Sequence, residues 1–361
     1  MQTEVIIKTL TSAPTTRVAI DEQDETMIRD QMKLPPGIKI AMQLPAEPSA
    51  EDLEFVRELG VQYVTTWAQA EQATPEFYMS RRKLVADAGL TLYGFGNIGV
   101  HNQDDIVLNL PGRDAKIEAY KQHLRRLAAA GIPYTTYAHM GNGIWSSARE
   151  KSRGAPARAF DLNGGAVGNW AGRPYDLPLS HGRVFSEAEI WDNYTYFIRA
   201  VAPLAEELGV LIGIHPDDPP QPMLGGVPRC IFSSFDGYRR ALEIAASPNV
   251  GICLCVGCWL EGGPLMGRGI LETIRYFGEQ GKIFKVHFRN VDAPLPHFVE
   301  SFLDNGYMDM RLVMRALREV GFNGVMIPNH IPVLANNPQV AAAYTIGTMQ
   351  ALLAGVLAEA Y

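Results

Sequence analysis

The sequence of 361 residues has no long apolar run and no recognisable export signal. No stretch approaches the ~18 consecutive apolar residues that are needed to span a bilayer. The N-terminus also lacks a basic region followed by an apolar stretch and a small-residue cleavage site. We therefore predict a cytoplasmic protein without a membrane partner.

Positive charge is also in short supply. The chain has 32 Lys and Arg against 39 Asp and Glu, a net charge of −7, and its basic residues form no long cluster. This balance gives no support to nucleic-acid binding, which depends on concentrated positive charge. Hydrophobic residues make up 47% of the chain, enough for a large core.

Cysteine is scarce, and three of the four cysteines crowd together as Cys253, Cys255 and Cys258. Without an export signal they are expected to be reduced thiols. Cys255 and Cys258 form a C-x-x-C pair, but a structural zinc site usually needs a second such pair. We favour strand alternation, with Cys253 and Cys255 on one face and Cys258 in the loop beyond.

Short apolar runs alternate with helical patterns from residue 38 onward, which predicts one (β/α)₈ TIM barrel over 36–361. Residues 1–35 are expected to form an N-terminal arm used in homo-oligomer contacts. The predicted strands are 38–44, 62–67, 90–96, 133–140, 210–215, 250–256, 283–289 and 324–328. The predicted helices are 50–59, 75–88, 113–130, 186–208, 235–247, 268–280, 309–320 and 336–359. Ser49, Ser186 and Asp236 stand where helix N-caps are expected.

The connection after the fourth strand, residues 141–185, is long and shows neither a helical nor a strand period. Such a segment in a compact domain is typical of an active-site lid or an interface loop. It is rich in arginine, with Arg149, Arg153, Arg158, Arg173 and Arg183. These side chains can bind a carboxylate substrate, or they can be solvated or lie between subunits.

Three consecutive predicted strands end in a metal-ligating residue: His215 on the fifth, Cys255 on the sixth and His287 on the seventh. Because parallel strands lie ~4.8 Å apart, three such side chains can reach one ion. Two imidazoles and a thiolate suit Zn²⁺, Fe²⁺ or Mn²⁺. The eighth strand adds Asn329, a possible amide-oxygen ligand, and His330, a ligand or a base.

Other polar residues near these strand ends are candidates for the same site. Asp217 and Asp218 follow His215 directly and can orient ligands or bind substrate hydroxyl groups. Arg289 shares a face with His287 and is placed to bind a substrate carboxylate. Tyr307 precedes the next helix and is predicted to reach the site.

Four motifs stand out at the predicted site: His-Pro-Asp-Asp-Pro-Pro at 215–220, Gly-x-x-x-Cys-x-Gly at 251–257, Val-His-Phe-Arg at 286–289 and Phe-x-Glu-x-x-x-x-x-Gly-x-Met-Asp-Met at 298–310. Together they resemble the mannonate dehydratase family. The resemblance implies a xylose-isomerase-like barrel that uses Mn²⁺ or Fe²⁺ to remove water from D-mannonate, giving 2-keto-3-deoxy-D-gluconate. It also implies that His215, Cys255 and His287 are metal ligands.

Two segments depart from the family pattern. The strand-eight motif Arg-Pro-Asp-His reads Ile-Pro-Asn-His here, so Asn329 replaces a carboxylate ligand while His330 is retained. The tryptophan-rich motif of the first strand is absent, and residues 40–45 read Ile-Ala-Met-Gln-Leu-Pro. The metal shell therefore loses one negative charge, and the substrate pocket is expected to differ.

We predict a metal-dependent lyase, a dehydratase that acts on a sugar acid. His330 is the expected base, and Tyr307 or Asp218 the group that protonates the departing hydroxyl. Mn²⁺ is the first expected cation, with Fe²⁺, Co²⁺ and Zn²⁺ as alternatives. Two other functions remain open: a metal-dependent isomerase, epimerase or β-eliminating lyase acting on a keto-sugar or glycoside, and a non-catalytic barrel that binds a sugar acid.

Overall fold

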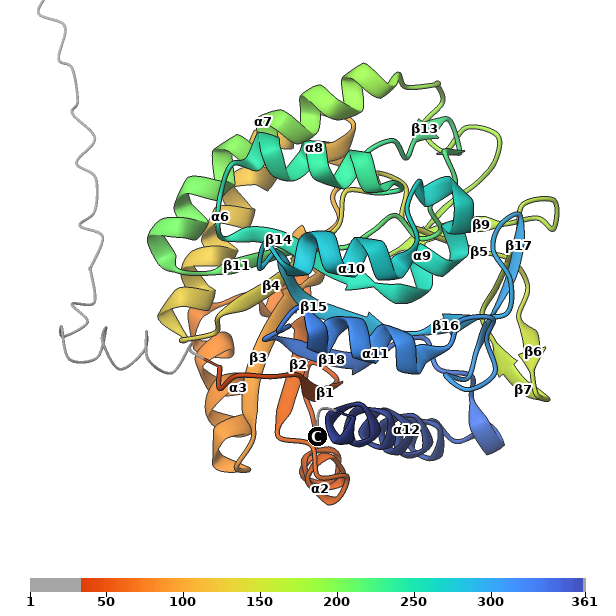
Figure 1. Ribbon diagram of the computed structural model, residues 1–361. Helices are drawn as coiled ribbons and strands as arrows, with labels where there is room; N and C mark the ends of the chain where they lie inside the picture. Colours follow the sequence, from red (N-terminus) through yellow and green to blue (C-terminus); the bar gives the residue numbers. More distant parts are fainter. Residues whose placement is uncertain (1–33, 360–361) are drawn as a thin grey trace, which may run out of the picture.

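The computed structural model describes residues 34–359, which form a closed parallel barrel surrounded by helices (Figure 1). The strands follow the order β1-β18-β15-β14-β11-β4-β3-β2 around the barrel. They are β1 (Lys39–Gln43), β2 (Tyr63–Ala68), β3 (Thr91–Asn97), β4 (Tyr134–Tyr137), β11 (Leu211–Ile214), β14 (Val250–Cys255), β15 (Ile283–Phe288) and β18 (Val325–Pro328). The predicted TIM barrel is confirmed, and each of its strands overlaps a predicted one.

Eight longer helices alternate with these strands and cover the outside of the barrel. They are α2 (Ala50–Glu58), α3 (Pro75–Asp87), α6 (Arg113–Ala129), α7 (Glu187–Leu208), α8 (Phe235–Ala245), α10 (Ile270–Gly278), α11 (Met310–Glu319) and α12 (Pro338–Ala358). Ser49 and Ser186 are N-caps with capping boxes, as predicted. The prediction for Asp236 was wrong, because Ser234 caps α8 and accepts from the N–H of Gly237.

Smaller elements lie at the strand ends. The short helices are α4 (Ile98–His101), α5 (Asp104–Val107) and α9 (Val256–Gly262), with 3₁₀ turns η1 (Ala70–Gln72), η2 (Gly263–Met266) and η3 (Leu334–Asn336). The short strands β12 (Met223–Leu224) and β13 (Val227–Pro228) form one hairpin, and β16 (Asn290–Val291) pairs with β17 (His297–Ser301). Cys258 lies in α9 rather than in a loop, because this helix begins directly after β14.

The connection 141–185 contains six short strands, which the expectation of an irregular loop missed. They are β5 (Ile144–Ser146), β6 (Glu150–Ser152), β7 (Ala155–Ala157), β8 (Ala159–Asp161), β9 (Val167–Trp170) and β10 (Arg173–Tyr175). β8 pairs with β17, so this connection is joined by backbone hydrogen bonds to the segment that follows β15. Strands of three or four residues are too short to show a period in sequence.

The predicted arm, residues 1–35, lies almost wholly outside the described residues. At the other end, α12 is by length and composition apolar enough to cross a membrane, contrary to the expectation from apolar runs. About 33% of its most apolar window is buried in the protein, and it packs against α11, β1 and β18 as the last helix of the barrel. Core helices of soluble proteins meet the same criterion.

The pairing register places the ends of β14, β15 and β18 at the same level. Cys255 pairs directly with His287, and His287 with Ile327, so the ends of β14, β15 and β18 are level. Every residue of β14 and β15 is buried, as is usual for strands covered on both faces. On β11, a Cβ at Gly213 would lie 2.3 Å from the Tyr134 hydroxyl, so glycine leaves room for that ring inside the barrel.

Candidate functional site

The three predicted metal ligands converge at the carboxyl ends of adjacent strands. His215 follows β11, Cys255 ends β14, and His287 lies near the end of β15. The Nε2 of His215 lies 3.1 Å from the Nδ1 of His287, and all three side chains are buried. The fold therefore brings the three predicted side chains together at neighbouring strand ends, as the sequence predicts.

The outer ring nitrogens of both histidines are already engaged. Nδ1 of His215 donates to the carbonyl of Pro216 over 2.7 Å, which fixes its Nε2 as the nitrogen with the lone pair. Nε2 of His287 lies 3.5 Å from the sulfur of Cys253. Such outer contacts orient the imidazoles of metal sites and set their tautomers. The inner nitrogens of His215 and His287 face each other and are available to a shared cation.

Cys255 is the residue of this group whose surroundings favour the anionic form. Burial alone would raise its pKa, but the Cys258 thiol and the Arg289 guanidinium lower it well below its usual range. Burial and the Cys255 sulfur raise the pKa of Cys258 in turn. These opposite shifts favour the thiolate form at Cys255 and the thiol form at Cys258. A thiolate is the form of cysteine that ligates metals.

The donor set fits a divalent cation. The amide oxygen of Asn329, directly after β18, is buried and has no hydrogen-bond partner among the described residues. A buried acceptor without a partner is costly, and a cation or a substrate group would satisfy it. Two imidazole nitrogens, a thiolate and an amide oxygen form a set suited to Zn²⁺, Fe²⁺, Co²⁺ or Mn²⁺.

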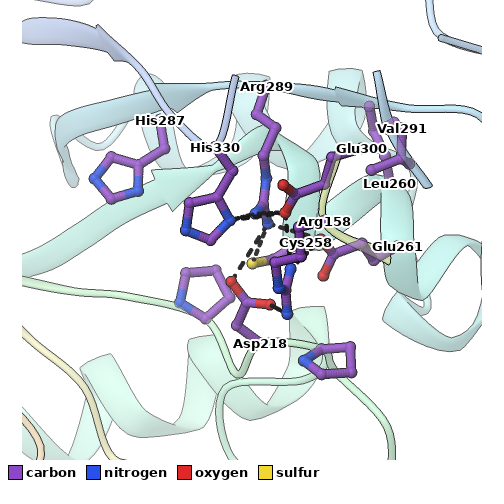
Figure 2. A network of polar contacts seen from close by, with 12 residues as sticks. Arg158, Asp218, Cys258, Leu260, Glu261, His287, Arg289, Val291, Glu300 and His330 are labelled. Atoms are coloured by element: carbon purple, nitrogen blue, oxygen red, sulfur yellow. Dashed lines mark hydrogen bonds and ion pairs between the residues drawn. The ribbon is translucent and has the colours of Figure 1, made fainter. Parts of the chain in front are cut away.

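A cluster of buried charges lies beside these residues (Figure 2). Arg289, only 1% exposed, donates to Glu300 over 2.6 Å and to Glu261 over 2.7 Å, and lies 3.5 Å from Asp218. Gly257 makes room for it, since a Cβ there would lie 1.9 Å from the Nε of Arg289. Charges so far from water are tolerated because they are paired.

One arginine of the long connection completes this cluster. Arg158, between β7 and β8, donates to Asp218 over 2.6 Å and to Glu300 over 2.8 Å. Arg153, Arg173 and Arg183 instead form ion pairs at the periphery, with Asp304, Asp104 and Glu189. The connection 141–185 therefore supplies one arginine to the site, and that arginine is paired with protein carboxylates.

His330 is oriented by this cluster. Its Nδ1 lies 2.7 Å from the Glu300 carboxylate and also contacts Nη1 of Arg289. A guanidinium only donates and a carboxylate only accepts, so the two contacts require opposite tautomers. We assign the proton to Nδ1, because Nδ1–H can then donate to the Glu300 carboxylate oxygen, which also accepts from Nη1 of Arg289. The Nε2 of His330 is then the basic nitrogen, on a side chain that is 30% exposed.

The carboxyl groups of the cluster differ in pKa. Burial opposes ionisation of Asp218, but Arg158 and Arg289 outweigh it and lower its pKa. The pKa of Glu300 is lowered as well, by His330 and the two arginines against the effect of burial. Burial raises the pKa of Glu261 well above its usual range. Two guanidiniums thus face three carboxyl groups, and among these burial favours protonation of Glu261.

Comparison with known proteins identifies the family. The model of the D-mannonate dehydratase (UxuA) family matches residues 47–163 and 178–356. The chain belongs to this family. The predicted family and enzyme class, a metal-dependent hydro-lyase, are thereby confirmed.

Individual relatives agree. Mannonate dehydratase 2 of Halalkalibacterium halodurans is 33% identical over 262 residues, which cover 67% of this chain and 74% of that protein. The crystal structure of mannonate dehydratase from Streptococcus suis serotype 2 has a TM-score of 0.77 and 27% identity, covering 90% of this chain and 95% of that one. A structure of L-ribulose 3-epimerase, at 13% identity and a TM-score of 0.60, shares the fold alone; it covers 90% of this chain and 97% of that one.

The remaining predicted site residues lie at different distances from this centre. Asp217 is buried, and desolvation raises its pKa to about 6. Tyr307 is 47% exposed and donates its hydroxyl hydrogen to the carbonyl of Leu260 over 2.6 Å. No described contact joins Tyr307 directly to His330 or Asp218. Arg289 does lie at the site, but its described polar contacts are all with protein side chains.

Sequence reasoning gave no role to Glu261, Glu300, Cys258 or His101. Glu300 stands in one of the family motifs, and Glu261 is an acidic residue in the otherwise apolar helix α9; both signals were present but unused. His101 is packed between Trp67 and Trp170, with ring centroids 4.8 and 5.0 Å away. Burial lowers its pKa to about 3, so it is neutral.

Proposed function

We propose that this protein dehydrates a sugar acid in a metal-dependent reaction, with D-mannonate as the substrate to test first. The observation that carries the proposal is the convergence of His215, Cys255 and His287 beside the His330–Glu300 pair. The names of the relatives support the choice of substrate. Asn329 is proposed as a donor to the cation in the substrate-bound enzyme, through its unpartnered amide oxygen.

A divalent cation in this shell would polarise the substrate's carboxylate and neighbouring hydroxyl, which acidifies the α C–H. The protein's own contribution begins with His330. With Nδ1–H directed to Glu300, the lone pair on Nε2 can accept the α-proton, and Glu300 stabilises the resulting imidazolium. Arg158 and Arg289 keep Glu300 ionised and in place, so they act as positioning residues.

The departing hydroxyl needs a proton, and two groups were predicted to supply it. Arg158 and Arg289 keep the pKa of Asp218 low, so this carboxylate has no proton to give. Burial raises the pKa of Tyr307 to about 12, so its hydroxyl is protonated at neutral pH. We therefore propose Tyr307 as the acid, which requires its hydrogen bond to Leu260 to break when substrate binds.

The predicted substrate-binding roles of Asp217 and Arg289 remain proposals. Asp217 follows the metal-ligand candidate His215 and is proposed to accept a hydrogen bond from a substrate hydroxyl. Arg289 would reach a substrate carboxylate only by giving up a bond to Glu261 or Glu300. Its effect on substrate is therefore proposed to act mainly through Glu300 and His330.

The test is incubation of the cation-reconstituted protein with D-mannonate and measurement of the 2-keto-3-deoxy product. The His330→Asn variant is the control, and its metal content is measured alongside. Product from the wild type, none from the variant and equal metal content in both would support the assignments. A product of unchanged mass would point to isomerisation or epimerisation, and loss of metal from the variant would make His330 a ligand.

Mn²⁺ is the first cation proposed for this test, with Fe²⁺, Co²⁺ and Zn²⁺ in parallel. A homo-oligomer is also proposed, because Leu177, Leu179 and Val184 of the long connection are exposed apolar side chains. Sedimentation velocity would reveal a monomer and overturn this. A cytoplasmic location is consistent with the four cysteines, all of which are free thiols.

A further inference from the structure

Cys258 completes a second set of metal donors that its predicted loop position would not have allowed. Donor atoms of His215, Cys255 and Cys258 all lie within 4.8 Å of one another, and the three side chains are buried. The spacing C-x-x-C accounts for this, because α9 begins at Val256 and one helical turn returns Cys258 to the side of Cys255. We propose that Cys258 is a metal ligand, so that the substrate-free site is Cys₂His₂. The inference rests on the proposed metal-dependent function.

The missing second pair, which argued against zinc in the sequence, is supplied by tertiary structure. A structural zinc site needs four donors, and C-x-x-C provides two. The other two would be His215, which belongs to the same group within 4.8 Å as both sulfurs, and His287, whose Nδ1 lies 3.1 Å from Nε2 of His215. Cys255 is also the register partner of His287 on the neighbouring strand. Its sulfur therefore lies between the C-x-x-C segment and the two histidines.

A neighbouring donor group shows why the cation would choose this set. Cys258 also lies within 4.8 Å of Asp218 and Glu261, which together form another potential metal site. That group is already occupied by a guanidinium: Arg289 Nη2 lies 2.7 Å from Glu261, 3.1 Å from the Cys258 sulfur and 3.5 Å from Asp218 (Figure 2). Among the described contacts, no arginine or lysine donates a hydrogen bond to His215, Cys255 or His287.

Two consequences follow for the chemistry of the site. A second thiolate restores the negative charge that Asn329 does not supply, and soft sulfur donors favour Zn²⁺, Fe²⁺ or Co²⁺ over Mn²⁺. Four protein donors would also close the shell. Substrate would then have to displace Cys258 or expand the coordination number, as catalytic zinc sites do in their transition states.

The experiment uses the full chain loaded with Co²⁺, without an activity assay. Thiolate-to-cobalt absorption per bound cobalt is compared in wild type, Cys258→Ser, Cys255→Ser and the control Cys230→Ser, which alters a cysteine outside the donor set. Two thiolate ligands predict that the absorption falls by about half in each of the first two variants and is unchanged in the third. Mn²⁺ in large excess is expected not to displace the cobalt.

Each outcome has a separate meaning. An unchanged spectrum in Cys258→Ser, with one cobalt bound per chain, would overturn the Cys258 proposal and leave the dehydratase proposal intact. Failure of the wild type to bind cobalt would instead remove the metal site on which both rest. If Cys258→Ser does not fold, X-ray absorption of the Zn²⁺-loaded wild type decides, since two sulfurs at about 2.3 Å are expected and a single sulfur would refute the proposal.

Discussion

Replacement of Glu300 by Gln tests how the buried charges control His330, the proposed catalytic base. The side chain accepts hydrogen bonds from Arg289 at 2.6 Å, from His330 at 2.7 Å and from Arg158 at 2.8 Å, and it is 1% exposed. Gln keeps the shape but removes the charge and replaces one acceptor oxygen with a donor group. Two guanidiniums and the imidazole then lose the carboxylate that holds them together.

The expected effects can be given a size. Removing one charged partner from a buried ion-pair network costs about 3–5 kcal/mol, and the retained amide oxygen favours the lower end of that range. The protein should still fold, because domains of this kind are stable by ~5–15 kcal/mol. Loss of the fixed tautomer and of the imidazolium's partner should reduce kcat by ~10²- to 10⁴-fold.

The pH dependence of stability follows from the Glu300 pKa, which is lowered below its ordinary value of 4.5. A carboxyl with a lowered folded pKa stabilises the protein above its unfolded pKa, and this stability disappears as pH falls through the folded pKa. The difference in unfolding free energy between wild type and Glu300→Gln should therefore be full at neutral pH and shrink on acidification.

The assays are denaturant unfolding from pH 3 to 8 and steady-state kinetics. The matched control is Glu150→Gln, because Glu150 also pairs with a histidine, His297, at 2.7 Å, but both side chains are 44% exposed. This change should alter stability by less than ~1 kcal/mol and leave kcat unchanged. If Glu300→Gln keeps kcat within about tenfold of wild type, a barrier change of only ~1.4 kcal/mol, Glu300 does not orient the base.

Three further outcomes are expected. Gly257→Ala should cost ~1–3 kcal/mol in thermal unfolding and abolish turnover, because the added Cβ would lie 1.9 Å from the Nε of Arg289. The control Gly355→Ala, on an open face of α12, should be neutral or stabilise the protein by up to ~1 kcal/mol. Chelation should lower Tm in calorimetry, and a cation at 100 times its Kd should restore about 2.7 kcal/mol; a Tm that is independent of cations would contradict the metal site. Tyr307→Phe should lower kcat by ~10²-fold or more without changing metal content, and full activity in this variant would exclude Tyr307 as the acid.

The barrel could be predicted from sequence because its signals are local. Strands such as β11 and β14 are short apolar runs, and helices of the outer layer begin at caps such as Ser49 and Ser186. The three metal-ligand candidates could be predicted for the same reason, since parallel strands end at one face of a barrel. The two side chains meet because Cys255 and His287 are direct register partners on neighbouring strands.

The charged cluster could not be predicted in this way. Arg158, Glu261, Arg289 and Glu300 come from a short strand connection, a seven-residue helix, the end of a barrel strand and an antiparallel strand. Arg289 was expected at the site from its position after the strand, but no periodicity links Arg158, Glu261 and Glu300 to it. These charges can be buried only because they pair with one another across distant segments. The sequence does not show that pairing, so it does not predict the burial either.

The junction of β14 and α9 concentrates three functions in four residues. Cys255 ends the strand as a ligand candidate, Gly257 leaves space for the Arg289 side chain, and Cys258 turns back toward the same centre. A helix that begins immediately after the strand is what makes this possible, because an extended continuation would carry Cys258 away. One helical turn further on, Glu261 meets the same guanidinium that Gly257 admits. The proposed metal ligands and the charged cluster are therefore coupled through a single short segment. A substitution that displaces Arg289 should disturb the cobalt spectrum as well as the proposed base, His330.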